Sequence, residues 1–343
     1  MSSAPEGRFH SVDVSSLTPG HRSAILRTSD GVTIEARHDP CTRGAAGGVP
    51  GGTDAGPGRT AIVVAHGFTG AVDKPSVRRA ARVFAAHAGV VTFSFRGHGR
   101  SGGRSTVGDR EVLDLAAAVA WARSLGYRRV VTVGFSMGGS VVLRHAALYG
   151  GGDDARTAAS AAGSPAPPGS ADGSAGKSAG ETGAAGDGGS SGDAENQGGT
   201  GRTEGAGSRE GRIGAQDVHT DAVAAVSAPA RWYYRGTPSM RRLHWVVTRR
   251  AGRLVGRYGL GTRIHHRAWD PVPLSPVQAV PFIAPTPLLI VHGDRDPYFP
   301  LDHPRMLAGA GPCELWLEPG MGHAENAADD ELLDRLADWL VRA

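Results

Sequence analysis

Short runs of consecutive apolar residues alternate with helical patterns along most of this sequence. The runs are residues 61–65 (AIVVA), 90–95, 130–135, 221–227 and 287–291 (PLLIV). A strand that is apolar on both faces must be covered on both faces, as in a parallel sheet. Helical periodicity is found at residues 77–88, 111–125 and 137–149. The alternation predicts an α/β fold, with a mostly parallel sheet and helices on both of its faces.

Both ends of the sequence add elements to this sheet. Two short apolar segments, residues 23–26 and 32–36, flank a Ser-Asp-Gly turn and predict a β-hairpin. The Gly- and Pro-rich residues 38–59 predict an exposed loop after it. Near the end of the sequence, residues 314–317 (ELWL) predict a last strand and residues 329–341 an amphipathic helix.

A long stretch in the middle of the chain lacks the residues that make a core. From Gly150 to Arg212 there is no Leu, Ile, Val, Met or aromatic residue. Such a composition buries too little apolar surface to offset the entropy of ordering the chain, so we expect a disordered insertion in one domain. The expected divisions are an N-terminal tail (1–22), a first core part (23–149), the insertion (150–220), a core strand (221–230), a cap (231–282) and a last core part (283–343).

Composition limits the classes of partner and compartment. The 343 residues carry a formal net charge of +4, which is modest, and no nucleic-acid-binding motif accompanies it. The two cysteines, Cys41 and Cys313, are too few for a disulfide framework, and no metal-ligand spacing occurs. The first residues have no apolar h-region and no apolar run approaches about 18 residues, so we expect neither a secretory signal nor a membrane-spanning helix. We therefore expect a cytoplasmic protein that uses no metal or cofactor and binds no nucleic acid.

A pentapeptide with a central serine follows the apolar run at residues 130–135 and precedes a helical pattern. In Gly134-Phe135-Ser136-Met137-Gly138 the serine would stand on a sharp strand-to-helix turn. Side chains at positions 134 and 138 would collide with neighbouring backbone there, so glycine is needed at both. The start of the following helix favours the negative charge that develops in acyl transfer. The pattern predicts Ser136 as a nucleophile; the alternative is an ordinary glycine turn.

A serine nucleophile needs a general base and a third group that orients the base. Asp296 and His323 each follow an expected strand, so both would lie at the carboxyl edge of the sheet, where open α/β sheets place their sites. The order Ser136, Asp296, His323 is the one expected after such a turn. For His323 the alternative is a capping or loop histidine. The other histidines, including His265 and His266, lack this placement and are expected at the surface.

A glycine-rich turn, residues 66–70 (HGFTG), follows the first buried strand. Gly67 would let a backbone N–H point at the substrate oxygen. The amides of Phe68 and Met137 would then form an oxyanion hole, worth roughly 3–4 kcal/mol per donor. The alternative is a purely structural turn, which is our interpretation of a second glycine-rich turn at residues 96–101 (RGHGRS).

Together these motifs resemble the α/β-hydrolase superfamily. HGFTG, RGHGRS, GFSMGG, HGDRDPYFP and GMGH carry the resemblance, which covers about residues 23–149 and 221–342. The similarity is greatest to the bacterial esterase, lysophospholipase and serine-aminopeptidase-like branch. It implies the α/β-hydrolase fold with an eight-stranded sheet, Ser136 as nucleophile, His323 as base and Asp296 as the acid that orients it.

Three positions refine this resemblance. Asp296 rather than Asp294 matches the family pattern HGxxDxxVP, which here is HGDRDPYFP. Phe299 replaces the usual valine of that pattern, which is a conservative change. Ser94 stands where an aspartate is common before the RGHG turn, and this predicts a looser turn with unchanged chemistry.

The expected helical cap has an unusual charge. Residues 231–269 contain ten arginines and no acidic residue. The apolar residues near one face of a single helical pattern are Met240, Leu243, Val247, Leu254 and Tyr258. A basic amphipathic helix can bind an anionic membrane surface or attract an acidic substrate. We favour the alternative, a cap that packs its apolar face on the core and leaves its arginines in solvent.

These residues predict a metal-independent serine hydrolase that cleaves small carboxylic esters or related acyl compounds through an acyl-enzyme. Three alternatives are a peptidase acting on an N-terminal residue, an acyltransferase and a non-catalytic binding protein. The peptidase would need acidic groups to hold the substrate amine, which residues 231–269 lack. An acyltransferase would need an acceptor pocket. Loss of one of the three catalytic residues would favour the binding protein, and none is lost.

Overall fold

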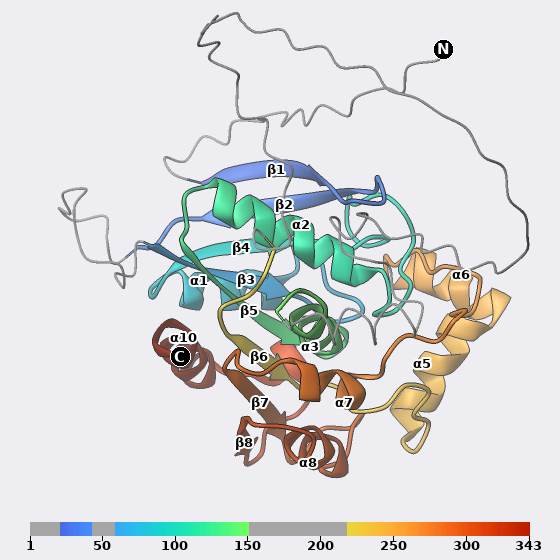
Figure 1. Ribbon diagram of the computed structural model, residues 1–343. Helices are drawn as coiled ribbons and strands as arrows, with labels where there is room; N and C mark the ends of the chain where they lie inside the picture. The colour runs from blue at the N-terminus through green and yellow to red at the C-terminus, as the bar shows by residue number, and fades with distance from the viewer. Residues whose placement is uncertain (1–20, 43–58, 151–217) are drawn as a thin grey trace, which may run out of the picture.

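One eight-stranded sheet runs through the computed structural model, which describes residues 21–42, 59–150 and 218–343. Its strands are β1 (Arg22–Arg27), β2 (Thr33–Asp39), β3 (Thr60–Ala65), β4 (Gly89–Phe93), β5 (Arg129–Phe135), β6 (Val223–Val226), β7 (Leu288–Gly293) and β8 (Glu314–Glu318). Their order is β1-β2-β4-β3-β5-β6-β7-β8 (Figure 1). The pairings of β1 with β2 and of β2 with β4 are antiparallel, and all others are parallel. The predicted eight-stranded, mostly parallel sheet is confirmed.

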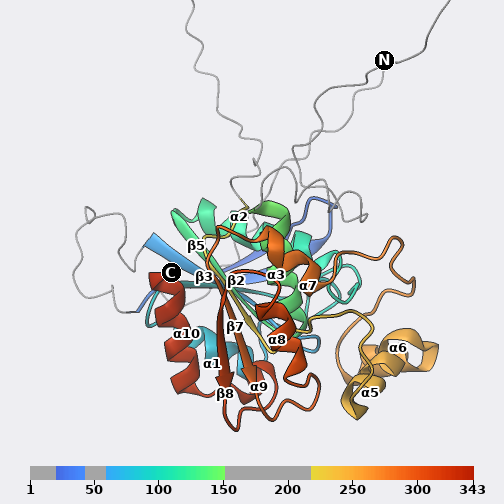
Figure 2. The same ribbon diagram turned by 60° about the horizontal axis from the view of Figure 1, so that its bottom comes forward.

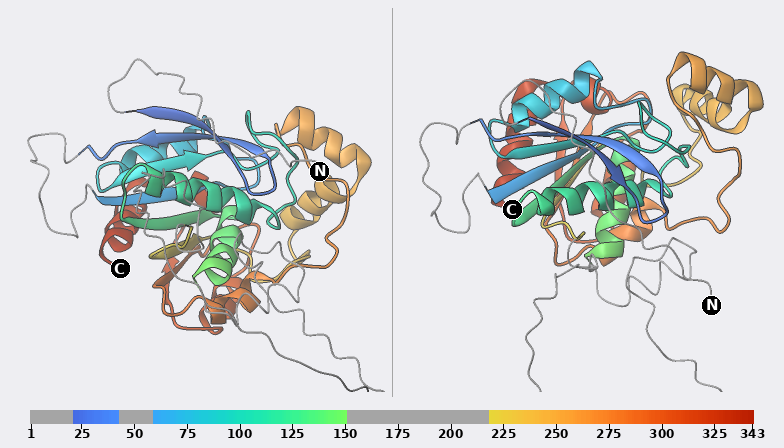
Figure 3. Two further views of the ribbon diagram at one scale, coloured as in Figure 1. Left: turned by 45° about the horizontal axis from the view of Figure 1, so that its top comes forward. Right: turned by 90° about the horizontal axis from the view of Figure 1, so that it is seen from above.

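Helices cover both faces of this sheet. They are α1 (Pro75–Phe84), α2 (Glu111–Ser124), α3 (Met137–Tyr149), α5 (Pro238–Thr248), α6 (Arg250–Gly259), α7 (Pro276–Ala279), α8 (Asp302–Ala308), α9 (Ala324–Ala327) and α10 (Asp330–Arg342). The helices α1, α9 and α10 pack on one face, and α2, α3, α7 and α8 pack on the other. The pair α5 and α6 stands to one side of these layers (Figures 2 and 3).

The apolar runs of the sequence are continuous because both sides of each central strand are buried. In β3, Ile62 and Val64 contribute to the core under α1 and α10. Ala61, Val63 and Ala65 contribute to the core under α2 and α3. All five side chains are at most 1 % exposed, as expected for a strand in the middle of a doubly covered sheet.

Some segment boundaries differ from the sequence-based expectations. Strand β2 extends to Asp39, so the loop expected at residues 38–59 begins later; residues 43–58 lie outside the described part of the chain. The expected N-terminal tail and insertion lie almost entirely outside it as well. The helices α7 and α9 were not predicted, because helices of four residues are too short to show a periodic pattern.

The expected single cap helix is two helices. The chain is extended at Arg249, with φ −92° and ψ 144°, which ends α5 and lets α6 begin in a new direction. Of the five apolar residues assigned to one face, those on α5 are buried or half-buried, as for Met240. Leu254 and Tyr258, on α6, are 58 % and 76 % exposed. The expectation that they pack on the core is therefore wrong, because the break at Arg249 separates them from the α5 face.

Ion pairs and buried hydroxyls fix the glycine-rich turn at residues 96–101. The Arg96 guanidinium donates to the carboxylates of Asp114 and Asp30, with 2.7 Å between Nη2 and Asp114 Oδ1. Ser94 Oγ donates to Glu35 Oε1 over 2.7 Å. The looser turn expected from Ser94 is not found, because Glu35 supplies a carboxylate to this loop from β2.

Removing the Arg96 side chain should destabilise the fold. In Arg96→Met, the Asp114 carboxylate would stay buried without its partner, which costs about 3–5 kcal/mol of unfolding free energy. Urea unfolding of wild type and variant measures the loss. The control Arg342→Met removes the exposed pair with Asp338 and should cost less than about 1 kcal/mol. Equal losses in the two variants would contradict a structural role for Arg96.

Candidate active site

Ser136 lies on a sharp turn between β5 and α3. Its backbone has φ 53° and ψ −113°, a conformation that costs a non-glycine residue roughly 1–3 kcal/mol. A methyl group at Gly134 would lie 2.2 Å from the carbonyl oxygen of Gly138, and one at Gly138 would lie 2.1 Å from that of Ala65. Neither position can hold a larger residue while the backbone keeps this path. The turn therefore needs both glycines to present Ser136.

Three of the expected site residues form a hydrogen-bonded chain. Ser136 Oγ lies 2.8 Å from His323 Nε2, and His323 Nδ1 lies 2.6 Å from Asp296 Oδ2. Because an ionised carboxylate only accepts hydrogen bonds, Nδ1 carries the imidazole proton and Nε2 is free to accept from the serine hydroxyl. Ser136 follows β5, Asp296 follows β7 and His323 follows β8. Because these strands are parallel, the three side chains lie at the same edge of the sheet.

The Asp296 carboxylate is held ionised although it is buried. Burial by itself would raise its pKa. The hydrogen bond and charge of His323, with the amides of Tyr298 and Phe299 on Oδ1, outweigh burial and hold the pKa of Asp296 below its usual value. Asp294 has a different role, since its Oδ1 accepts from the amide of Gly320 at an exposed position.

The turn at residues 66–70 lies against Ser136, and a buried histidine sets its direction. The Phe95 amide donates to His66 Nε2 over 3.0 Å, so Nδ1 carries the proton and donates to the Gly67 carbonyl over 2.6 Å. In a planar trans peptide the carbonyl and the next N–H point in opposite directions. His66 therefore also fixes the direction of the Phe68 N–H. Among the described residues, no acceptor is bound to the amide of Phe68 or of Met137.

Comparison with known proteins identifies the fold. A family model described as alpha/beta hydrolase fold matches residues 60–182. The chain has the α/β-hydrolase fold. No curated protein matches this sequence.

Solved structures with the same fold include two esterases. The first is esterase Pf2001 from Pyrococcus furiosus, 17% identical, with a TM-score of 0.56 and coverage of 96% of this chain and 95% of the esterase. The second is Est1E from Butyrivibrio proteoclasticus, solved with ferulic acid, 16% identical, with a TM-score of 0.50 and coverage of 93% and 100%. At this level of identity the likeness shows the fold.

Two buried histidines, His66 and His98, hold the turn at residues 66–70, and neither role was foreseen from the sequence. Burial lowers the pKa of His66 to about 3, so the ring stays neutral and keeps its single proton on Nδ1. His98, from the turn at residues 96–101, lies between two carbonyl oxygens, with Nε2 at that of Phe68 and Nδ1 3.0 Å from that of Arg96. Residues 96–101 were interpreted as a structural turn, and the contact with Phe68 agrees with that interpretation, because it supports the turn at residues 66–70.

Glu325 is a further residue that the sequence did not single out. It is 4 % exposed, and its Oε1 accepts from the Gly67 amide over 3.1 Å. A methyl group at Gly67 would lie 3.2 Å from the same oxygen, so the carboxylate also limits residue size there. Burial raises the pKa of Glu325 above its usual value. The only signal in the sequence was its position two residues after His323.

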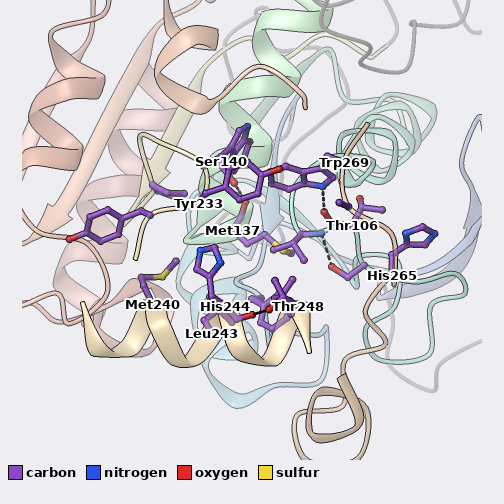
Figure 4. Close-up of a pocket in the computed structure, with 18 of the residues that line it drawn as sticks. Thr106, Met137, Ser140, Tyr233, Met240, Leu243, His244, Thr248, His265 and Trp269 are labelled. Atoms are coloured by element: carbon purple, nitrogen blue, oxygen red, sulfur yellow. Dashed lines mark hydrogen bonds between the residues drawn. The ribbon is translucent and has the colours of Figure 1, made fainter. Parts of the chain in front are cut away.

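A cavity of about 280 Å³ is lined by Ser136 and by residues of α5, including Met240 and Leu243 (Figure 4). Its apolar and aromatic lining consists of Phe68, Val107, Met137, Trp232, Tyr233, Tyr234, Met240, Leu243, Val247, Trp269 and Phe299. Basic side chains lie among them, including His265, which the sequence placed at the surface. No aspartate or glutamate is part of this lining among the described residues.

The described residues contain neither a cluster of metal-ligating side chains nor a membrane-spanning helix. No group of three or more His, Cys, Asp or Glu side chains in residues 21–42, 59–150 and 218–343 could hold a metal ion. The two cysteines are half-buried and not bonded to each other. No helix in these ranges has the length and apolar character needed to cross a bilayer.

Replacing the buried Glu325 carboxylate by an amide should stabilise the fold at neutral pH. Because its pKa is raised in the folded state, ionisation costs stability once the pH is above the unfolded-state value of about 4.3. Glu325→Gln keeps an acceptor for the Gly67 amide. Urea unfolding should show the variant to be more stable at pH 7.5, with the difference shrinking as the pH falls toward 4.

An exposed acidic residue provides the control. Glu331→Gln on α10 should change stability by less than about 0.5 kcal/mol at either pH. If Glu325→Gln were less stable than wild type at pH 7.5, the prediction would be wrong. The negative charge of Glu325 would then support the turn at residues 66–70, and not only its size and its acceptor oxygen.

Proposed function

We propose that this protein is a serine hydrolase that cleaves carboxylic esters through an acyl-enzyme. The observation that carries the proposal is the hydrogen-bonded chain from Ser136 through His323 to Asp296 at the end of an apolar cavity. The strained turn at Ser136 supports it, since such backbone conformations persist at functional sites.

The geometry suggests a two-step reaction. Ser136 Oγ attacks the ester carbonyl while His323 Nε2 takes the hydroxyl proton, and the tetrahedral intermediate then expels the alcohol, which receives that proton. Water repeats the sequence on the acyl-enzyme and releases the acid. Asp296 keeps the imidazole in the required tautomer and stabilises its positive charge.

Two backbone amides are suited to hold the intermediate's oxyanion. Phe68 and Met137 line the cavity together with Ser136, and neither backbone N–H has an acceptor among the described residues. Each such donor contributes roughly 3–4 kcal/mol to the barrier reduction. Met137 is the first residue of α3, so the positive end of the helix dipole adds to its effect.

The cavity lining supports an ester over an aminoacyl substrate. A peptidase acting on an N-terminal residue would need a carboxylate for the substrate ammonium group, and the described lining has none. Apolar and aromatic side chains instead favour an uncharged acyl chain or an aromatic group of the substrate. The preferred class is therefore a small carboxylic ester with an apolar acyl part.

Loss of the Ser136 hydroxyl should abolish ester turnover. With 4-nitrophenyl butyrate as substrate, kcat/KM of Ser136→Ala should fall by at least about 10³-fold, because the nucleophile is gone. The control Ser124→Ala, at the exposed end of α2, should keep wild-type turnover. Undiminished hydrolysis by Ser136→Ala would contradict the assignment.

A substrate panel separates the proposed activity from its alternatives. Wild-type enzyme should hydrolyse 4-nitrophenyl esters far faster than aminoacyl 4-nitroanilides, since no carboxylate is available for an ammonium group. Faster cleavage of the anilides would favour the peptidase. Transfer of the acyl group to an added alcohol in preference to water would favour the acyltransferase.

A further inference from the structure

Helix α6 buries its glycines rather than its large apolar side chains. Gly252 and Gly256 are its buried residues. A methyl group at Gly252 would lie 2.3 Å from the Trp245 carbonyl oxygen, and one at Gly256 would lie 2.8 Å from Ile264 Cδ1. The helix therefore lies close against α5 through a face that has no side chains.

The apolar stripe of α6 faces solvent. It consists of Ala251, Leu254, Val255 and Tyr258, whose spacing of three, four and seven residues places them on one side of the helix. Leu254 is 58 %, Val255 45 % and Tyr258 76 % exposed. An amphipathic helix of a globular protein usually turns such a stripe to the core. Exposed apolar surface bordered by polar groups marks an interaction site.

Arginines border this stripe and have no acidic partner among the described residues. Arg250, Arg253 and Arg257 occupy the next sector of α6, and Arg249 precedes them. Of the ten arginines in residues 231–269, Arg231 alone is ion-paired with a carboxylate of the described chain. The partner of this surface must supply negative charge together with an apolar phase.

A basic hollow on α5 adds a place for one anionic group. It has a volume of about 480 Å³ and is lined by Arg235, Arg241, His244, Trp245, Thr248 and Arg249. Burial and the charge of Arg235 lower the pKa of His244, so the imidazole is neutral and the arginines carry the charge. The exposed ring of Trp245, an amphipathic side chain suited to a lipid interface, borders the hollow.

We propose that α5 and α6 bind the protein to an anionic phospholipid surface. The stripe of Ala251, Leu254, Val255 and Tyr258 enters the interface, the bordering arginines contact lipid phosphates, and the basic hollow holds a headgroup. The helix pair stands to one side of the sheet and its covering helices, and the stripe of α6 is exposed there (Figures 2 and 3).

Two other occupants fit the surface less well. A second copy of the chain would bring the same arginines against one another. Residues 150–212 of this chain offer acidic side chains but no Leu, Ile, Val, Met or aromatic residue to cover the stripe. An anionic bilayer supplies both the charge and the apolar phase.

Membrane binding would also bring the cavity to its substrates. Met240 and Leu243, on α5, line the cavity next to Ser136 (Figure 4). The substrate class that follows, acyl esters that partition into membranes, rests on the proposed esterase function. The binding itself does not, and it can be measured without turnover.

Vesicle flotation of the full chain tests the binding. The Ser136→Ala protein should float with vesicles of phosphatidylcholine and phosphatidylglycerol at about 0.1 M salt and bind pure phosphatidylcholine weakly, since the arginines need anionic lipid. Leu254→Ser with Tyr258→Ser should lower the partition coefficient by at least about tenfold. The double variant Arg249→Gln, Arg250→Gln should also lower the partition coefficient, by about fivefold for each arginine removed.

Matched variants elsewhere on the surface control for general effects. Ile25→Ser, at a 49 % exposed position on β1, and Arg82→Gln with Arg305→Gln should leave vesicle binding unchanged. All variants should keep the wild-type melting temperature, because they alter exposed side chains. Hydrolysis of soluble 4-nitrophenyl butyrate by the same variants on the active background reports separately on the esterase proposal.

Three results would overturn the inference. The first is equal binding to anionic and neutral vesicles, or to neither. The second is an unchanged partition coefficient in the Leu254→Ser, Tyr258→Ser variant. The third is a dimer of the wild-type protein that this variant converts to a monomer, which would assign the stripe to contact between copies of the chain.

Discussion

The close backbone packing around Ser136 is the constraint on which the rest of the site depends. Gly138, at the start of α3, lies so near the Ala65 carbonyl of β3 that no side chain fits between them. The Ser136 amide donates to Val226 of β6 over 2.8 Å. These contacts come from the centre of the sheet, where the elements are buried and rigid, and they hold a strained residue that a looser scaffold would release.

Buried polar groups also orient the glycine-rich turn at residues 66–70, which lies next to Ser136. His66 fixes the Gly67 carbonyl, His98 fixes that of Phe68, and Glu325 accepts from the Gly67 amide. Because these groups are buried, their protonation states are part of the structure. A charged His66 would lose its acceptor for Phe95, and the direction of the Phe68 N–H would no longer be fixed.

The sequence predicted the central elements well because their patterns are local. Continuous apolar runs identified the buried strands, and the order of motifs pointed to Ser136, Asp296 and His323 before the structure brought them together. It could not reveal contacts such as that between Gly67 and Glu325, which are 258 residues apart. It also misplaced the stripe of α6, because helical periodicity shows which residues share a face but not whether that face meets the core or solvent.

The most direct test of the proposed mechanism is the position of a covalent adduct formed by a fluorophosphonate. Such a reagent phosphonylates a serine whose hydroxyl is activated by a neighbouring base, and peptide mass spectrometry locates the modified residue. The account predicts one adduct, on Ser136, and its loss when His323 is replaced by alanine. No adduct, an adduct on another residue, or equal labelling without His323 would contradict it.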